Sequence, residues 1–403
     1  MPEQPTVVLV GTLDTKGSEY AFVRRRLADA GVATLVVDTG VLGEPAIEAD
    51  VSRAEVAVAG GADLASLVEA GDRGAAVAAM AEGAAVVVQR LYAEGRCAGA
   101  LALGGTGGTS LAARAFADLP LGLPKVIVST AASGDTSAYV GESDLILIPS
   151  VTDVAGVNRI SARILANAAA AVAGMVAAPA PQVDDAKPLI GASMFGVTTP
   201  CVTEARRLLE NLGYEVLVFH MTGTGGRTLE RLIADGWLAG VLDVTTTELA
   251  DELVGGVFSA GPARLTAAAA AGVPQVVSVG ALDMVNFGPK DTVPARFADR
   301  NLYVHNASVT LMRTTAQECA ELGRRVATRL AGSGATIFLP LGGVSAIATP
   351  GGPFHDAAAD QALFDAIRST VDDTIEVVER PEDVNDPAFA AAMVDRLHAQ
   401  VRK

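Results

Sequence analysis

The chain is poor in cysteine and in aromatic residues: three of its 403 residues are cysteines, and Phe, Trp and Tyr together make up 4%. Cys97, Cys201 and Cys319 are odd in number, far apart and in no metal-ligand spacing. This pattern fits a reducing cytoplasm in which each thiol is a small core residue.

Basic residues are also few: 30 Lys and Arg stand against 46 Asp and Glu, which gives a net charge of -16. A phosphate backbone or an anionic membrane repels such a surface, so we expect no nucleic-acid partner and no membrane partner. The first residues, MPEQPTVVLVG, contain neither a basic region nor a long apolar run. We therefore expect no signal peptide, no membrane span and a cytoplasmic location.

Several motifs of well-known enzymes are missing as well. The sequence contains no G-x-S-x-G elbow, so a serine hydrolase is not expected, and it has no fixed metal-ligand spacing such as H-E-x-x-H. Its glycine-rich turns match neither the dinucleotide G-x-G-x-x-G nor the G-x-x-x-x-G-K-[ST] phosphate loop. Any phosphate site must therefore be built from a different glycine turn.

Half of the residues are hydrophobic, and alanine, valine, leucine and glycine dominate. This mixture is typical of parallel sheets covered by alanine-rich helices. The alternation of strands and helices from Thr6 onward predicts an α/β fold of two Rossmann-like, doubly wound domains with mainly parallel sheets. The segment PAPQVDDAKP predicts a linker at 179–188, between an N-terminal domain at 1–178 and a C-terminal domain at 189–403.

The predicted elements follow from apolar runs and from glycine boundaries. In the N-terminal domain the strands are Thr6–Val10, Ala33–Asp38, Ala98–Leu103, Pro124–Ser129 and Leu145–Ile148, and the helices are Gly17–Ala30, Ala75–Glu94 and Ile160–Ala177. In the C-terminal domain the strands are Leu189–Met194, Tyr214–Phe219, Val241–Val244, Gln275–Val279 and Thr336–Leu339, with helices at Cys201–Leu212 and from Thr228, and with a helix, a strand and a helix in Asp360–Lys403. The polar stretch Asp50–Gly74 has no clear period. Ligands of such sheets bind beyond the carboxyl ends of the strands.

The glycine-rich turn Gly104–Ser110 follows a buried strand and leads into a helix that Thr109 or Ser110 can cap. Glycines let a phosphate approach the backbone, and the N–H groups of a helix N-terminus hold the anion. The turn therefore predicts a phosphate site. The alternative is a tight strand-to-helix turn without a ligand.

Two further loops end strands that we expect at the same edge of the sheet. In GTLDTKG, Gly11–Gly17, Lys16 precedes a helix and can reach a phosphate, while Asp14 can hold a magnesium ion. The alternative is a surface lysine and a capping aspartate. Asp38 ends the second strand, where an acid commonly binds a ribose hydroxyl. Alternatively, it bonds to its own turn through Thr39 and Gly40.

The C-terminal domain has a different set of polar residues at predicted strand ends: His220, Asp283, His305 and Arg313. His220 precedes a TGTGG turn whose helix N-terminus would favour an anionic group. If these side chains converge, a histidine can act as the acid–base group while Arg313 holds the charge of a small anionic metabolite. The alternative is that both histidines only satisfy buried backbone groups.

Several motifs are spread along nearly the whole chain: GTLDTKGSEYAFVRRRL, LGGTGGTSLA, HMTGTGGRTLE, GVLDVTTTELADELVGG, VGALDMVNFG and YVHNASVTLMRTT. Together they resemble those of one two-domain family, typified by the tomato inhibitor of tobamovirus RNA replication. One departure is Val384 in ERPEDVNDPAFA, where the family usually has isoleucine. The resemblance implies two Rossmann-like domains, ATP in the N-terminal one, and a homodimer. It implies an ATP site at Gly11, Thr12, Asp14, Thr15, Lys16, Gly17, Asp38, Thr39, Gly40, Gly104, Gly105, Thr106, Gly107, Gly108, Thr109 and Ser110.

Two classes of function follow from these expectations. The first is an ATP-binding protein, with magnesium at Asp14 and a small anionic ligand in the C-terminal domain, whose nucleotide regulates or stabilises a protein complex. The second is a metabolic enzyme, a hydrolase, lyase or isomerase, with acid–base chemistry in the C-terminal domain and ATP as substrate or regulator. The crowd of polar groups in the second domain favours the enzyme, and the missing catalytic motifs favour the binding protein.

Overall fold

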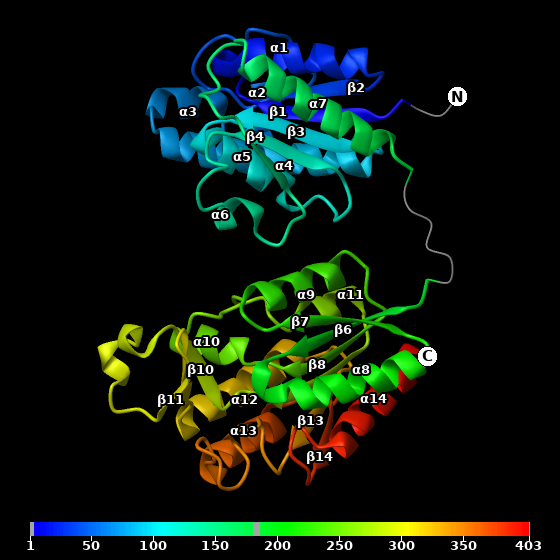
Figure 1. Cartoon of the computed structure of the whole chain (residues 1–403), viewed down its shortest axis with the longest axis vertical. Helices are drawn as coiled ribbons and strands as arrows, with labels where there is room; N and C mark the ends of the chain where they lie inside the picture. Colours follow the sequence, from blue (N-terminus) through cyan, green and yellow to red (C-terminus); the bar gives the residue numbers. More distant parts are fainter. Residues whose placement is uncertain (1–3, 180–185, 403) are drawn as a thin grey trace. The chain divides into compact units, whose positions relative to one another are not determined.

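The computed structural model describes residues 4–179 and 186–402 (Figure 1). The chain divides into two compact units, Met1–Gln182 and Val183–Lys403, each with its own sheet and core. Most of the linker predicted at 179–188 lies outside the described residues. The predicted α/β class with two mainly parallel, Rossmann-like domains is confirmed.

The N-terminal sheet contains five parallel strands in the order β2-β1-β3-β4-β5. They are β1 Thr6–Gly11, β2 Ala33–Asp38, β3 Gly99–Gly104, β4 Lys125–Ser129 and β5 Ile146–Pro149. Each lies within two residues of its predicted range. The chain leaves β1 toward β2 on one side and returns to β3 on the other, so the order reverses between β1 and β3. Open parallel sheets bind ligands at this point, beyond the carboxyl ends of the strands.

Helices cover both faces of this sheet (Figure 1). α1 Leu13–Asp29 and α7 Ser161–Ala177 pack on one face. α2 Arg53–Ala59, α4 Arg73–Ala93 and α5 Thr106–Ala117 pack on the other. The short α3 Leu64–Ala70 and α6 Ser137–Val140 bury none of their residues. The stretch 50–74 thus contains two helices of seven residues each, which are too short to display a helical period in the sequence.

Three helices begin earlier than predicted, inside the glycine-rich turns. α1 begins at Leu13 instead of Gly17, α5 begins at Thr106 instead of after Thr109, and α9 begins at Thr224 instead of Thr228. Thr109 does not cap α5, because its hydroxyl lies within the helix and bonds to the Gly105 carbonyl and to Ser129. Glycine is tolerated in a first turn when packing fixes the backbone, so a glycine run does not mark where a helix starts.

The C-terminal domain contains a six-stranded parallel sheet in the order β14-β13-β9-β8-β6-β7. Its strands are β6 Leu189–Met194, β7 Glu215–His220, β8 Gly240–Thr245, β9 Gln275–Gly280, β13 Thr336–Pro340 and β14 Glu376–Arg380. One face carries α8 Thr199–Asn211 and α14 Pro387–Val401. The other carries α9 Thr224–Ala234, α10 Glu248–Val254, α11 Ala267–Ala271, α12 Ala316–Leu330 and α13 Ala357–Thr370.

A second, antiparallel sheet in this domain was not predicted. It has the order β10-β12-β11, with β10 Met284–Phe287, β11 Leu302–Asn306 and β12 Val309–Arg313. Short 3-10 turns lie at Gly196–Thr198, Lys290–Thr292 and Ala295–Phe297. The strands have only four or five residues and mix polar with apolar side chains, so the sequence reads as a polar loop instead of a sheet.

The expected core thiols and membrane properties can be compared with the described residues. All three cysteines are free and buried, as predicted. One described helix, α4, is long and apolar enough to cross a membrane by length and composition. Half of that stretch is buried inside the domain, as in a core helix, where Met80 and Val88 pack against the sheet.

Candidate functional site

A cavity of about 610 Å³ opens at the carboxyl ends of β1, β2 and β3, where the strand order reverses. Its walls come from the predicted loops after these strands and, in addition, from α3 and the start of α4. The lining residues are Thr12, Asp14, Thr15, Lys16, Thr39, Val41, Leu42, Leu67, Val68, Gly71, Asp72, Arg73, Ala76, Val77, Met80, Gly105, Thr106, Gly107, Gly108, Leu111 and Asp153. The volume lies within the range of small-molecule sites.

The structure brings nine of the sixteen proposed ATP residues to this cavity: Thr12, Asp14, Thr15, Lys16, Thr39, Gly105, Thr106, Gly107 and Gly108. The other seven are Gly11, Gly17, Asp38, Gly40, Gly104, Thr109 and Ser110, and they lie outside its lining. The three loops therefore converge as expected, but individual residues within them have different roles.

Three of the glycines outside the lining are needed for close packing. A β-carbon on Gly11 would lie 2.0 Å from the hydroxyl oxygen of Tyr20, and one on Gly104 would lie 2.9 Å from the α-carbon of Gly108. One on Gly17 would lie 2.6 Å from Ala46. The Tyr20 hydroxyl itself donates to the carbonyl of β1 residue Val10 and accepts from the N–H of β3 residue Leu103. Gly11 and Gly104 thus let α1 and α5 lie close to β1 and β3, and Gly17 lets the loop at Ala46 pack against α1.

Asp38 holds the backbone of its own turn. Its Oδ1 accepts hydrogen bonds from the N–H of Gly40 at 2.9 Å and of Leu13 at 3.1 Å. The side chain is buried, and burial raises the pKa of its carboxyl group. The predicted ribose contact is therefore corrected: Asp38 fixes the turn and the start of α1, which was the alternative interpretation.

Two helix N-termini form the polar end of the cavity. No side chain in the described ranges accepts a hydrogen bond from the first-turn N–H groups of α5, at Thr106, Gly107 and Gly108. Lys16 lies inside α1, not before it, at a kink with φ -129° and ψ 19°. Its Nζ donates to the Val154 carbonyl at 2.5 Å while its side chain lines the cavity. Positive groups and free amides of this kind favour an anion.

Asp14 and Thr39 each present a polar atom without a partner. Asp14 Oδ2 accepts from the Leu42 N–H at 2.8 Å, but Asp14 Oδ1 is buried and has no hydrogen-bond partner among the described residues. The same holds for the hydroxyl oxygen of Thr39, a residue with 2% of its surface exposed. A buried polar atom left unpaired costs free energy, so these atoms fit a site that a ligand or ion completes.

The residues present fit the predicted magnesium ion. Magnesium usually keeps several waters and binds one or two carboxylates together with substrate phosphates. Asp14, with its unpaired oxygen, and Asp153 both line the cavity. Within 4–179 and 186–402 no group of three or more His, Cys, Asp or Glu is arranged to hold a metal alone. A magnesium ion would therefore depend on a bound phosphate group.

The cavity also has a large apolar lining. It is made up of Val41, Leu42, Leu67, Val68, Val77, Met80 and Leu111. At the rim, 83% of the surface of Leu42 is exposed, although leucine is among the residues most often buried. A cavity lined by both apolar side chains and cations can take a ligand that has a flat apolar part and an anionic part.

Sequence reasoning missed Arg73, which lines the cavity at the first turn of α4. The signal available was the Asp-Arg-Gly sequence before a long alanine-rich helix: Asp72 is the N-cap and accepts from Gly74 and Ala75. The sequence alone could place Arg73 at a helix start, but not beside the glycine turn after β3.

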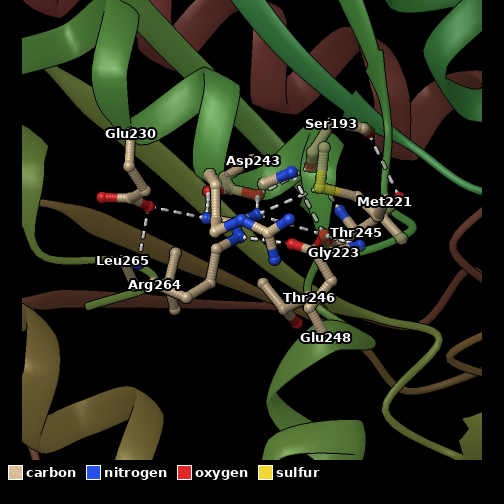
Figure 2. A network of polar contacts seen from close by, with 12 residues as sticks. Ser193, Met221, Gly223, Glu230, Asp243, Thr245, Thr246, Glu248, Arg264 and Leu265 are labelled. Atoms are coloured by element: carbon tan, nitrogen blue, oxygen red, sulfur yellow. Dashed lines mark hydrogen bonds and ion pairs between the residues drawn. The ribbon is translucent and has the colours of Figure 1, made fainter. Parts of the chain in front are cut away.

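The C-terminal domain contains a buried charge network that the sequence did not reveal (Figure 2). Arg264 is fully buried and forms ion pairs with Asp243 at 2.6 Å, Glu248 at 2.8 Å and Glu230 at 3.0 Å. Burial raises the pKa of Glu248, while Arg264 acts in the opposite direction. Buried charges persist only when they are paired, so these side chains hold one another in place.

This network corrects the predicted anion site at the TGTGG turn. Glu248 Oε1 accepts from the N–H of Gly223 at 2.7 Å and of Gly226 at 3.1 Å, at the N-terminus of α9 (Figure 2). A β-carbon on Gly226 would lie 1.9 Å from Glu248 Oε2. The carboxylate of the chain itself occupies the position expected for an external anion, because α9 begins at Thr224 and presents its amides to Glu248.

The four predicted catalytic residues are brought together only in part. Arg313 lies beside Asp283, donates to its backbone carbonyl at 3.4 Å, and forms an ion pair with Asp360 at 2.5 Å. Burial raises the pKa of Asp283 to about 6 although Arg313 lowers it, and Asp283 Oδ1 has no partner among the described residues. His220 is exposed and its ring lies 5.3 Å from that of Phe195, while His305 is exposed on β11. No described hydrogen bond or ion pair joins either histidine to Asp283 or Arg313.

The fold and the cavity define a two-domain α/β protein whose N-terminal domain has the geometry of a small-ligand site. Residues 5–181 match the N-terminal domain and residues 187–401 the C-terminal domain described as "Uncharacterised protein family (UPF0261)". The chain belongs to this family, which includes the tomato proteins that the sequence motifs resemble.

Two relatives and one solved structure illustrate these similarities. The chain is 50% identical over 400 residues to a UPF0261 protein of Clostridium tetani, covering 98% of this chain and 99% of that protein. It is 40% identical to the tomato (Solanum lycopersicum) ToMV susceptible protein tm-1, covering 97% of this chain but 55% of that protein. A UDP-N-acetylglucosamine 2-epimerase from Rickettsia bellii covers 68% of this chain and 79% of its own at 11% identity and a TM-score of 0.24, which supports no functional argument.

Proposed function

We propose that this protein binds a nucleotide, with ATP as the first candidate, in the cavity of its N-terminal domain. The observation that carries the proposal is one cavity of about 610 Å³ at the β1/β3 reversal, lined by free helix amides, a lysine and several apolar side chains. The resemblance of the motifs to the tomato family is the reason for testing ATP first.

The mixed lining of the cavity suits both parts of a nucleotide. The phosphates lie against the N-terminus of α5, whose glycines at 107 and 108 leave the backbone accessible, and Lys16 adds a positive charge. The base lies among Leu42, Leu67 and neighbouring apolar side chains. Magnesium, when bound, neutralises phosphate charge, and Asp14 is the residue that would hold it.

The experiment is calorimetry of the full chain with Mg-ATP, using Gly107→Val as the test variant. A β-carbon on Gly107 meets no atom closer than 3.9 Å, so valine fits the fold but extends into the cavity beside the phosphates. Gly174→Val is the matched control, because Gly174 is also helical and a β-carbon there has no neighbour within 4 Å. We expect Gly107→Val to abolish binding and the control to retain it. If Gly107→Val binds ATP like the wild type, the turn is only structural.

A second candidate function is a metabolic enzyme, a hydrolase, lyase or isomerase, with acid–base chemistry in the C-terminal domain. One observation favours it: a pKa of about 6 and an unpaired oxygen at Asp283, next to Arg313. Perturbed carboxyl groups cluster at functional sites. Turnover of small anionic metabolites that is lost in Asp283→Asn would support this candidate. The homodimer and the cytoplasmic location also stay predictions.

A further inference from the structure

The side chain of Arg73 is charged and uncommitted at the rim of the N-terminal cavity. No hydrogen bond or ion pair in the described ranges 4–179 and 186–402 involves it, whereas the neighbouring Asp72 is used by the helix as its N-cap. Lys16, the other cation of the lining, already donates to the Val154 carbonyl. Arg73 is therefore the cation whose whole donor set is available to a ligand.

The guanidinium lies next to the first turn of α5. Its Nη2 is 3.9 Å from the position of a β-carbon on Gly107, and both residues line the cavity. Gly71, between α3 and α4, has φ +62°, a conformation that glycine adopts without strain, and it lets α4 start at this rim. The chain thus places a free arginine fork beside the free amides of a helix N-terminus.

A second polar group of the cavity is also uncommitted. The Thr39 hydroxyl has no partner, although 98% of the residue is buried, since 2% of its surface is exposed. This group belongs to a different loop from Arg73 and α5, so it supports independently the view that the cavity receives a polar ligand.

We propose that Arg73 makes the site prefer nucleoside triphosphates over diphosphates and monophosphates, because its guanidinium binds the terminal phosphate. The inference rests on the proposed nucleotide site. A planar guanidinium binds phosphate oxygens through two parallel hydrogen bonds, which a single N–H group or a lysine does not match. With the first phosphates held at α5 and Lys16, the third phosphate reaches Arg73 at the rim, and shorter nucleotides leave it unused.

Calorimetry of the full chain with ATP, ADP and AMP, each with magnesium, tests the proposal. A hydrogen bond to a charged group corresponds to a preference for ATP over ADP of roughly tenfold to a hundredfold in the wild type. Arg73→Gln is expected to lower ATP affinity by about that factor and to leave AMP affinity unchanged. Arg73→Lys, which keeps the charge but loses the fork, should retain an intermediate preference. Arg90→Gln is the matched control, because Arg90 is an exposed residue near the other end of the same helix.

Three outcomes would overturn the proposal, and they separate it from the nucleotide site itself. If the wild type binds none of the three nucleotides, both the site and the role of Arg73 are wrong. If the wild type binds all three nucleotides with equal affinity, or if Arg73→Gln lowers all three affinities by the same factor, the nucleotide site is supported but Arg73 does not bind the terminal phosphate. Thermal unfolding at the wild-type temperature would show that the variant is folded.

Discussion

Replacing Arg264 should destabilise the C-terminal domain far more than breaking a surface ion pair of the same length. The guanidinium is fully buried and pairs with two carboxylates that are themselves fully buried, Asp243 and Glu248, and with the mostly buried Glu230. Arg264→Met fills much of the volume but leaves these carboxylates without their cation. Removing one partner of a buried pair costs about 3–5 kcal/mol.

The control is Arg207→Met on the exposed side of α8. Arg207 pairs with Glu204 at 2.6 Å, the same distance as the closest contact of Arg264, but 60% of its side chain is exposed. Water screens such a pair, so the expected cost is about 0–1 kcal/mol. The two variants therefore share the length of the closest ion pair but differ in burial and in the number of carboxylates left without their arginine.

The assay is urea unfolding followed by the fluorescence of Trp237, the single tryptophan of the chain, which lies in the C-terminal unit. Arg264→Met should lower the free energy of unfolding by several kcal/mol more than Arg207→Met. Arg264→Lys should fall between them, because a lysine keeps the charge but cannot bind three carboxylates through a planar fork. Equal losses for Arg264→Met and Arg207→Met would refute the view that this network holds the domain together.

Two further predictions concern the nucleotide site and the buried acid Asp283. Lys16→Ala should weaken ATP binding by about 1.5–3 kcal/mol, as for a hydrogen bond to a charged group, while the exposed Lys290→Ala should have no effect; equal affinities in calorimetry would remove Lys16 from the site. Burial raises the pKa of Asp283 from 3.8 to about 6, so its contribution to stability is fully present below pH 3.8 and is lost as the pH rises through about 6. Between pH 4 and 7 the free energy of unfolding should therefore fall by about 2 kcal/mol relative to Asp283→Asn, and unfolding curves with a constant difference would contradict this.

The strands could be predicted because a buried parallel strand is an uninterrupted apolar run. Val7 to Val10 in β1 and Ala100 to Leu103 in β3 are buried on both faces, and their sequence contains no polar residue. The loops that follow such strands must meet at one edge, so the convergence of three polar loops also followed from the sequence. This reasoning identifies the edge, but it cannot tell which residue of a loop faces the cavity.

The remaining parts depend on residues that are distant in sequence. Arg264 lies in GPARL, a stretch that resembles a solvated loop, and its burial requires carboxylates at three other positions of the chain. Arg73 and the apolar wall from α3 belong to the stretch without a helical period, so this part of the cavity lining had no signal in the sequence. Asp38 is a similar case within one loop. The sequence allowed a contact to a ribose or to its own turn, and only the structure shows the bond to the Gly40 N–H.

The two T-G-G turns of the chain show why similar sequences can differ in function. Each turn follows a parallel strand and starts a helix, and each therefore creates a positive N-terminus. At α9 the amides of Gly223 and Gly226 are bonded by Glu248, which lies 25 and 22 residues away in sequence and is fixed by Arg264. At α5 no described side chain fills the corresponding place, and a cavity lies in front of it instead. The carboxylate of Glu248 thus bonds to the amides at the start of α9, while the amides at the start of α5 remain available to an external anion. We therefore expect the ligand of this chain to bind in the N-terminal domain.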